Sequence, residues 1–199
     1  MMVAKRIFDL LFSLMGILVL APIFLAIAVW IKVDSPGSVF FRQVRVGQFG
    51  KEFRIYKFRT MVTNAEALGK QITVGEDPRI TDCGRFLRKY KLDELPQLFN
   101  VLKGDMSLVG SRPEVPKYVA LYTPEQLKVL ELPPGITDLA SIRFRNESEL
   151  LAQAENPEEF YVKEIMPQKL ELNKQYLAQA NLIFDLYIIL QTLWRLGFE

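Results

Sequence analysis

Two adjacent carboxylates, Asp93 and Glu94, have the residue types and spacing best suited to chemistry, and they lie within Leu92-Asp93-Glu94-Leu95-Pro96. One carboxylate of such a pair can attack an electrophile or bind a divalent cation. The pattern also has a structural interpretation, in which Asp93 is the N-cap of a helix and Glu94 an acidic residue of its first turn. The spacing alone leaves both interpretations open.

Basic residues that could bind phosphate flank this pair along the sequence. Arg85 and Arg88 are three residues apart and would share one face of a helix. Arg112 precedes a proline in a Gly-rich loop, where its guanidinium could clamp a phosphate. The basic residues around position 57 could instead form the solvent-exposed face of a strand, with no role in phosphate binding. The candidate phosphate-binding residues are Lys57, Arg59, Arg85, Arg88, Arg112 and Arg145.

Composition narrows the possible chemistry. The 199 residues include no histidine and one cysteine, which excludes histidine catalysis, a disulfide framework and a multi-cysteine metal site. Residues 1–112 hold 17 Lys and Arg against 10 Asp and Glu, whereas the remainder holds 8 against 13. A basic first part suits phosphate-rich ligands or an anionic membrane surface. No groove-reading motif is present, so we expect no nucleic-acid partner.

An uncharged run of 22 residues, Leu10 to Ile31, predicts attachment to a lipid bilayer. The run is longer than the apolar region of a signal peptide, although Ala26-Ile27-Ala28 resembles a cleavage site. Pro22 predicts a kink near Ala21. Because basic residues flank both ends of the run, a spanning helix and a re-entrant helix both remain open.

The rest of the chain predicts a mostly helical α/β fold with one small β-hairpin. A turn at 34–37 ends the apolar segment, and alternating residues at 39–46 and 53–59 predict the two strands of the hairpin. The last helix is apolar and amphipathic, and is either buried or interfacial. Loops are expected at 104–116 and 132–137. Helices are predicted at 64–69, 83–90, 93–102, 147–154, 157–179 with a break near Pro167, and 182–198.

Four motifs occur in a distinctive order along the chain. They are Tyr56 to Met61, Leu92 to Leu98, Gly104 to Pro113, and Pro134 to Thr137. In this order they closely resemble the bacterial sugar transferases, and in particular the small monotopic polyprenyl-phosphate phosphoglycosyl transferases, over nearly the whole chain. Ser111, and Asp138 with Ser141, depart from the residues that many members carry, and these departures leave the sugar unassigned.

The resemblance implies an architecture and a set of roles. Residues 1–34 would form a re-entrant membrane helix broken near Pro22, and residues 35–199 a catalytic domain with amphipathic interfacial helices, on the cytoplasmic face of the bacterial inner membrane. Asp93 would be the nucleophile and the contact for Mg²⁺, and Glu94 its partner. Lys57, Arg88 and Arg112 would bind phosphate.

The implied activity is transfer of a phosphosugar from a UDP-sugar to polyprenol (undecaprenyl) phosphate, with release of UMP through a covalent aspartyl-phosphosugar. The habit of the family favours an N-acetylated or amino-deoxy hexose. Such a reaction initiates bacterial surface glycan or glycoconjugate assembly. A non-catalytic membrane-anchored scaffold or regulator that retains the fold is the alternative, and the intact dyad with Lys57 and Arg112 favours the enzyme.

Overall fold

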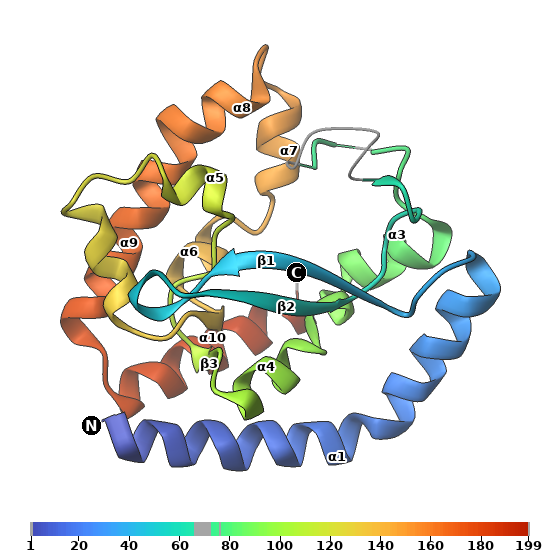
Figure 1. The fold of residues 1–199 in the computed structure, drawn as a ribbon, viewed down its shortest axis with the longest axis horizontal. Coiled ribbons are helices and arrows are strands. Elements are labelled where there is room, and N and C mark those ends of the chain that lie inside the picture. The colour runs from blue at the N-terminus through green and yellow to red at the C-terminus, as the bar shows by residue number, and fades with distance from the viewer. Residues whose placement is uncertain (1, 66–72, 76, 199) are drawn as a thin grey trace.

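A computed structural model of the chain describes residues 2–65, 73–75 and 77–198. Within this part the fold is mostly helical, with a small antiparallel hairpin and a short parallel pair of strands (Figure 1). The predicted class, mostly helical with a hairpin, is therefore confirmed. The predicted helix at 64–69 lies largely outside the described residues.

The N-terminal segment forms one helix, α1 (Met2–Asp34), which is long and apolar enough to cross a membrane. Pro22 lies inside α1, and the helix is bent along its length (Figure 1). The predicted break is thus a bend, without an interruption of the helix at Ala21 or Pro22. A proline bends a helix because its ring removes one backbone donor and clashes with the preceding turn.

The first turns of α1 are attached to the rest of the protein by charged side chains. Lys5 Nζ donates to Asp185 Oδ2 over 2.6 Å. Arg6 donates to the carbonyl oxygens of Val101 and Leu102 over 2.7 and 3.0 Å. These two carbonyls lie in the last turn of α4 (Gln97–Lys103), where orphan acceptors need partners. The start of α1 is therefore held against α4 and α10 (Leu182–Phe198).

The other end of α1 is attached to the same body. The Arg59 guanidinium donates to the carbonyl oxygens of Ser35 and Pro36 over 2.7 and 2.9 Å, just beyond the end of the helix. Asp34 accepts a hydrogen bond from the Cys83 backbone N–H. Apolar side chains of the second half of α1 pack into one cluster with the hairpin and α3 (Asp82–Lys89). Both ends of the apolar helix thus contact the rest of the chain.

The hairpin consists of β1 (Phe40–Val46) and β2 (Glu52–Phe58), joined through η1 (Gln48–Gly50). The strands are antiparallel, with Phe41 opposite Lys57 and Arg45 opposite Phe53. Because side chains alternate across a strand, Arg45 and Lys57 share the face that carries Ile55. Ile55 is buried against α4, so this face looks into the protein. The predicted hairpin is confirmed.

A second sheet was not predicted. β3 (Ser107–Val109) pairs in parallel with β4 (Gly135–Thr137), in two segments expected to be loops. Strands of three residues are too short to show an alternating pattern. A Cβ on Gly135 would lie 2.1 Å from the Gly110 nitrogen, so the two backbones meet where only glycine fits.

The remaining helices agree with the prediction in part. The segment predicted as 157–179 is divided by a π-helical turn just before Pro167, and the helix predicted to begin at residue 93 begins at Gln97. The helix at 182–198 is confirmed. The bounds not yet given are η2 Leu92–Glu94, α5 Pro116–Val119, η3 Gln126–Glu131, α6 Leu139–Arg143, α7 Glu147–Ala152, α8 Pro157–Phe160, η4 Tyr161–Ile165 and α9 Met166–Gln179.

Candidate active site

The two candidate catalytic carboxylates lie in η2, a single 3₁₀ turn between α3 and α4. Lys91 enters this turn with φ 55, a left-handed conformation that redirects the chain. Asp93 is buried and 6% exposed. The N-cap position of α4 is Pro96, with no side-chain capping bond, so the interpretation of Asp93 as the N-cap is wrong.

Glu94 is held by two basic side chains. Its Oε1 accepts from Lys57 Nζ over 2.9 Å and from Arg112 Nη2 over 2.5 Å, and its Oε2 accepts from Arg112 Nη1 over 2.9 Å. Burial would raise the pKa of Glu94, but the charges and hydrogen bonds of Arg112 and Lys57 outweigh burial and hold this pKa well below its usual value. Glu94 is therefore an ionised group that orients Lys57 and Arg112.

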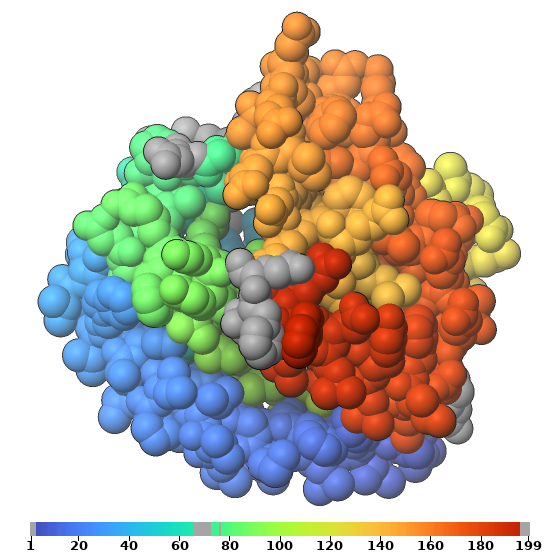
Figure 2. Space-filling model, turned by 180° about the vertical axis from the view of Figure 1, so that it is seen from behind, coloured from blue at the N-terminus to red at the C-terminus, as the bar shows by residue number. Residues whose placement is uncertain are grey.

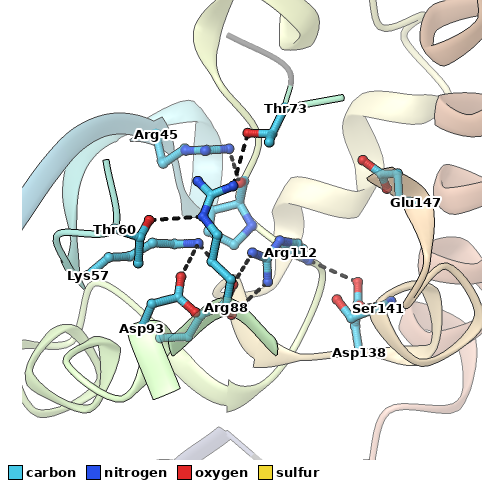
Figure 3. A network of polar contacts seen from close by, with 12 residues as sticks. Arg45, Lys57, Thr60, Thr73, Arg88, Asp93, Arg112, Asp138, Ser141 and Glu147 are labelled. Carbon is cyan, nitrogen blue, oxygen red and sulfur yellow. Dashed lines mark hydrogen bonds and ion pairs between the residues drawn. The ribbon is translucent and has the colours of Figure 1, made fainter. Parts of the chain in front are cut away.

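Asp93 has far fewer polar contacts than the neighbouring Glu94. Its nearest charged partner is Lys57, with 3.8 Å between Oδ2 and Nζ, and no hydrogen bond from the described residues reaches its carboxylate (Figure 3). Burial raises the pKa of Asp93, and the charge of Lys57 opposes that rise. One carboxylate of the pair is thus occupied and the other is available to react.

Arg88 supplies a positive charge beside the pair. Its Nε donates to Thr60 Oγ1 over 2.9 Å and its Nη1 to Thr73 Oγ1 over 3.3 Å (Figure 3). Within the described part of the chain, Arg88 has no carboxylate ion pair. Burial lowers the pKa of Arg88, and the charge of Asp93 opposes this shift. A half-buried guanidinium that is oriented by hydroxyl groups rather than neutralised by a carboxylate suits an anionic ligand.

Arg112 lies in the loop that follows β3. Its side chain makes the fork to Glu94, and its backbone N–H donates to Asp138 Oδ2 over 3.0 Å. The charge of Glu94 is the main reason that the pKa of Arg112 is raised above its ordinary value. Lys57 from β2, the carboxylates from η2, Arg88 from α3 and this loop therefore converge from four separate segments.

The other three basic candidates have different partners. Arg59 is buried and holds the end of α1, as described above. Arg85 is exposed at the surface of α3 and pairs with Asp82. Arg145 donates to the carbonyl of Arg195 near the end of α10. The contacts of Arg59 and Arg85 include none to the carboxylate pair among the described residues, so the site is built around Lys57, Arg88 and Arg112.

Sequence reasoning missed Arg45 as a residue of the site. Its Nη1 donates to the Pro113 carbonyl over 3.1 Å and lies 3.5 Å from Glu114 Oε1. Tyr161 donates its phenolic hydrogen to the other oxygen of Glu114. Burial lowers the pKa of Arg45. The period-two alternation with Phe41 and Gln43 in β1 was the signal that could have placed Arg45 on the same face as Lys57.

A cleft of about 3330 Å³ opens onto these residues. Its polar part is lined by the carboxylate pair and the basic residues, and its apolar part includes Phe12 and Met15 of α1 with Ile189 and Leu193 of α10. From behind, the surface is hollowed between α3 and α4 (green), α7 (amber) and α10 (red) (Figure 2). The cleft thus joins a charged centre to an apolar edge.

The donor set around the carboxylate pair fits a magnesium ion only in part. No group of three or more Asp, Glu, His or Cys that could hold a metal occurs among the described residues. Mg²⁺ is commonly held by one or two carboxylates together with substrate phosphates and water. Asp93 alone has oxygens available for this, because both oxygens of Glu94 are occupied. The residues therefore fit an ion that arrives with a phosphate ligand.

The chain is similar to known proteins along its whole length. The family model described as bacterial sugar transferase matches residues 1–199. A sugar transferase of Bacillus subtilis, described as uncharacterised, is 46% identical over 147 residues, which cover 73% of this chain and 71% of that protein.

Two relatives carry names that describe a reaction. A UDP-N-acetylgalactosamine-undecaprenyl-phosphate N-acetylgalactosaminephosphotransferase of Aeromonas hydrophila is 51% identical over 115 residues, 58% of this chain and 27% of that protein. A UDP-glucose:undecaprenyl-phosphate glucose-1-phosphate transferase of Escherichia coli is 36% identical over 201 residues, 96% of this chain and 39% of that protein. This chain therefore spans about a quarter and about two fifths of these two relatives.

Proposed function

The chain belongs to the bacterial sugar transferase family, and from this premise we propose that it transfers a phosphosugar from a UDP-sugar to polyprenol phosphate with release of UMP. The observation that carries the proposal is the difference within the carboxylate pair. Glu94 is fully engaged by Lys57 and Arg112, whereas Asp93 is buried, free of hydrogen bonds from the described residues, and 3.8 Å from Lys57 Nζ, with the charge of Arg88 also acting on it.

The first step uses Asp93 as the nucleophile. An Asp93 oxygen attacks the β-phosphorus of the UDP-sugar, and the bond from that phosphorus to the bridging oxygen breaks. UMP leaves with the electron pair, and an aspartyl-phosphosugar remains. In the second step an oxygen of polyprenol phosphate attacks the same phosphorus, the bond to Asp93 breaks, and a polyprenyl-diphosphate sugar forms. No proton needs to be removed from an ionised carboxylate, so the absence of histidine is no obstacle.

The basic residues make this attack possible. A carboxylate repels an anionic diphosphate unless cations neutralise the charge. Arg88, which lacks a carboxylate ion pair in the described residues, binds the donor phosphates, while Lys57 lies 3.8 Å from Asp93 and Arg112 contacts the neighbouring Glu94. Mg²⁺ held by Asp93 together with the donor diphosphate would supply Lewis-acid stabilisation of the developing charge.

The sugar is proposed to be an N-acetylated or amino-deoxy hexose. The names of the relatives specify N-acetylgalactosamine for one and glucose for another, so relatedness alone does not select between them. The test is release of UMP in detergent, with undecaprenyl phosphate as acceptor and a panel of UDP-sugars. Release with one donor and formation of lipid-linked sugar support the proposal. Absence of UMP release with every donor, from folded protein, favours a non-catalytic scaffold.

The attachment of both ends of α1 to one body supports a re-entrant membrane helix. A straight spanning helix would leave its two ends on opposite sides of the bilayer, but Lys5 and Arg6 at one end and Asp34 at the other contact the same domain. We therefore propose residues 1–34 as a re-entrant anchor and residues 35–199 as the catalytic domain. A charged UDP-sugar does not cross lipid unaided, which favours the cytoplasmic face of the inner membrane.

Cysteine labelling tests this placement, because the natural Cys83 is fully buried. Ala4→Cys and Ser38→Cys lie at exposed positions near the two ends of α1. Both are expected to react with a membrane-impermeant maleimide in inside-out vesicles and not in intact cells. Val19→Cys, within the apolar run, is expected to be protected in both preparations. Labelling of the two end positions from opposite sides would contradict a re-entrant helix.

Removal of Lys57 is expected to change the pH dependence of the reaction. The reactive form of Asp93 is ionised, so activity rises as pH rises through the pKa of Asp93. Burial raises that pKa, and Lys57 is the main opposing charge. Lys57→Met should therefore move the acid limb of kcat/KM to higher pH, and lower kcat/KM by about 10²-fold at neutral pH.

The measurement is UMP release between pH 4.5 and about 9, with the exposed Lys51→Met as the matched control on the same hairpin. We expect the control to keep the wild-type profile. An acid limb that stays in place or moves to lower pH in Lys57→Met would show that Lys57 does not assist ionisation of Asp93.

A further inference from the structure

We propose that Asp138 is a positioning residue for this reaction, and that it acts by fixing the backbone of Arg112. The inference rests on the proposed function above and names a residue that was noted in the sequence only as a departure from the family pattern. Asp138 follows β4 and touches neither member of the carboxylate pair. Its effect on the reaction must therefore pass through Arg112.

The contacts of Asp138 join two segments that are far apart in sequence. Its Oδ2 accepts from the Arg112 backbone N–H over 3.0 Å, and its Oδ1 accepts from the Ser141 N–H over 2.6 Å (Figure 3). The Asp138 side chain is completely buried. A buried carboxylate is costly unless hydrogen bonds compensate it, and here each oxygen has one donor.

These bonds continue the pairing of β3 with β4 beyond the end of the strands. The Gly110 N–H donates to the Thr137 carbonyl over 3.1 Å, and the next available donor, the Arg112 N–H, meets the Asp138 carboxylate instead of a backbone carbonyl. A side chain thus supplies the last rung of the pairing at the residue whose guanidinium binds Glu94. The hydrogen bond from the Arg112 N–H to Asp138 therefore fixes the position of the Arg112 backbone.

A series of alternating charges then connects Asp138 to the nucleophile. Arg112 contacts Glu94 in a two-bond fork, Glu94 contacts Lys57 over 2.9 Å, and Lys57 lies 3.8 Å from Asp93. Displacement of the Arg112 backbone would break the fork, because bidentate geometry tolerates little movement. Lys57 would then lose the partner that orients it towards Asp93.

An N-cap role alone does not account for this arrangement. Asp138 does cap α6, yet α6 has only five residues. Another short helix of the chain, α8, is capped by Asn156, which is exposed and binds only within its own turn. Only one oxygen of Asp138 is needed for capping, and the other is committed to Arg112.

The test is a double-mutant cycle measured by UMP release with the donor found active for the wild-type protein. Asp138→Ala is expected to lower kcat/KM by about 10²-fold, the loss typical of a misplaced group. In an Arg112→Ala background, Asp138→Ala should lower kcat/KM by less than about twofold, because the guanidinium through which Asp138 acts is already absent. Asn156→Ala is the matched control, which loses a cap and should keep wild-type kcat/KM.

A second variant keeps the cycle informative if Asp138→Ala folds poorly. Asp138→Asn retains an acceptor for one N–H group, but its amide NH₂ then faces the other N–H group. We expect Asp138→Asn to fold, as judged by its thermal unfolding, and still to lose at least about tenfold in kcat/KM through Arg112.

The outcomes separate the inference from the function on which it rests. Absence of UMP release by the wild-type protein overturns the proposed function. Wild-type activity with fully active Asp138→Ala and Asp138→Asn overturns the positioning role alone. An equal loss for the Asp138 variants in the wild-type and Arg112→Ala backgrounds also overturns it, because Asp138 would then act independently of Arg112.

Discussion

Asp93→Asn is expected to abolish UMP release, with a loss of at least about 10⁴-fold in kcat. The amide has nearly the shape of the carboxylate but is neutral, so its remaining oxygen is a poor nucleophile. Asp93 is buried and has no hydrogen bond from the described residues, so the substitution breaks no network that Glu94, Lys57 and Arg112 maintain among themselves. We therefore expect the variant to stay folded while it loses the reaction.

Two measurements check this result. The first is UMP release, and the second is retention of labelled phosphosugar on the protein after denaturation, in the absence of polyprenol phosphate. Asp82→Asn, on the exposed surface of α3, is the matched control and should keep wild-type activity. Turnover by Asp93→Asn within tenfold of the wild type, or labelled adduct on that variant, would contradict the covalent scheme.

Arg112→Ala is expected to impair both activity and stability. The change removes both hydrogen bonds of the fork to Glu94 and leaves that largely buried carboxylate, 12% exposed, with Lys57 as its sole ion-pair partner in the described residues. Loss of one preorganised cationic donor lowers kcat by about 10²- to 10³-fold. Breaking a buried pair costs about 3–5 kcal/mol of the free energy of unfolding, and we expect the lower end because Arg112 is 34% exposed.

Arg112→Lys distinguishes charge from geometry. Lysine keeps the positive charge but cannot make two parallel bonds to one carboxylate, so we expect it to recover stability more than activity. Arg85→Ala, at the surface of α3, is the control and should change neither. Steady-state kinetics and thermal unfolding give the two readouts. Full recovery of kcat by lysine would show that the fork is not needed.

The motifs and the carboxylate pair could be identified from the sequence because each consists of residues that are adjacent or nearly adjacent in the chain. The hairpin and the final helix followed from periodicity. The pairing of β3 with β4 did not, since it joins two strands of three residues each, about 28 positions apart, and depends on close backbone contact between Gly110, just after β3, and Gly135 in β4. The same pairing places Asp138 beside Arg112, and for that reason sequence reasoning did not connect them.

Burial and partners decided the roles of individual charged residues. Arg59 belongs to the same motif as Lys57 and lies two residues after it, a spacing that places both side chains on one face of a strand. Its guanidinium nevertheless binds the backbone carbonyls that follow α1. Arg45 belongs to none of the four motifs, yet its side chain lies on the same face of the hairpin as that of Lys57. Sequence spacing places two residues on one face of a strand but does not say what that face will meet.

The sequence by itself determined the family and the long apolar N-terminal helix, and it predicted carboxylate and phosphate chemistry for a chain without histidine. Tertiary structure alone decided that Asp93 and Glu94, which are adjacent and alike, have different partners. Lys57 and Arg112 arrive from distant segments and occupy Glu94, which leaves Asp93 buried without a hydrogen bond from the described residues. The free energy of a buried charge depends on the groups around it, and those groups are assembled only by the fold.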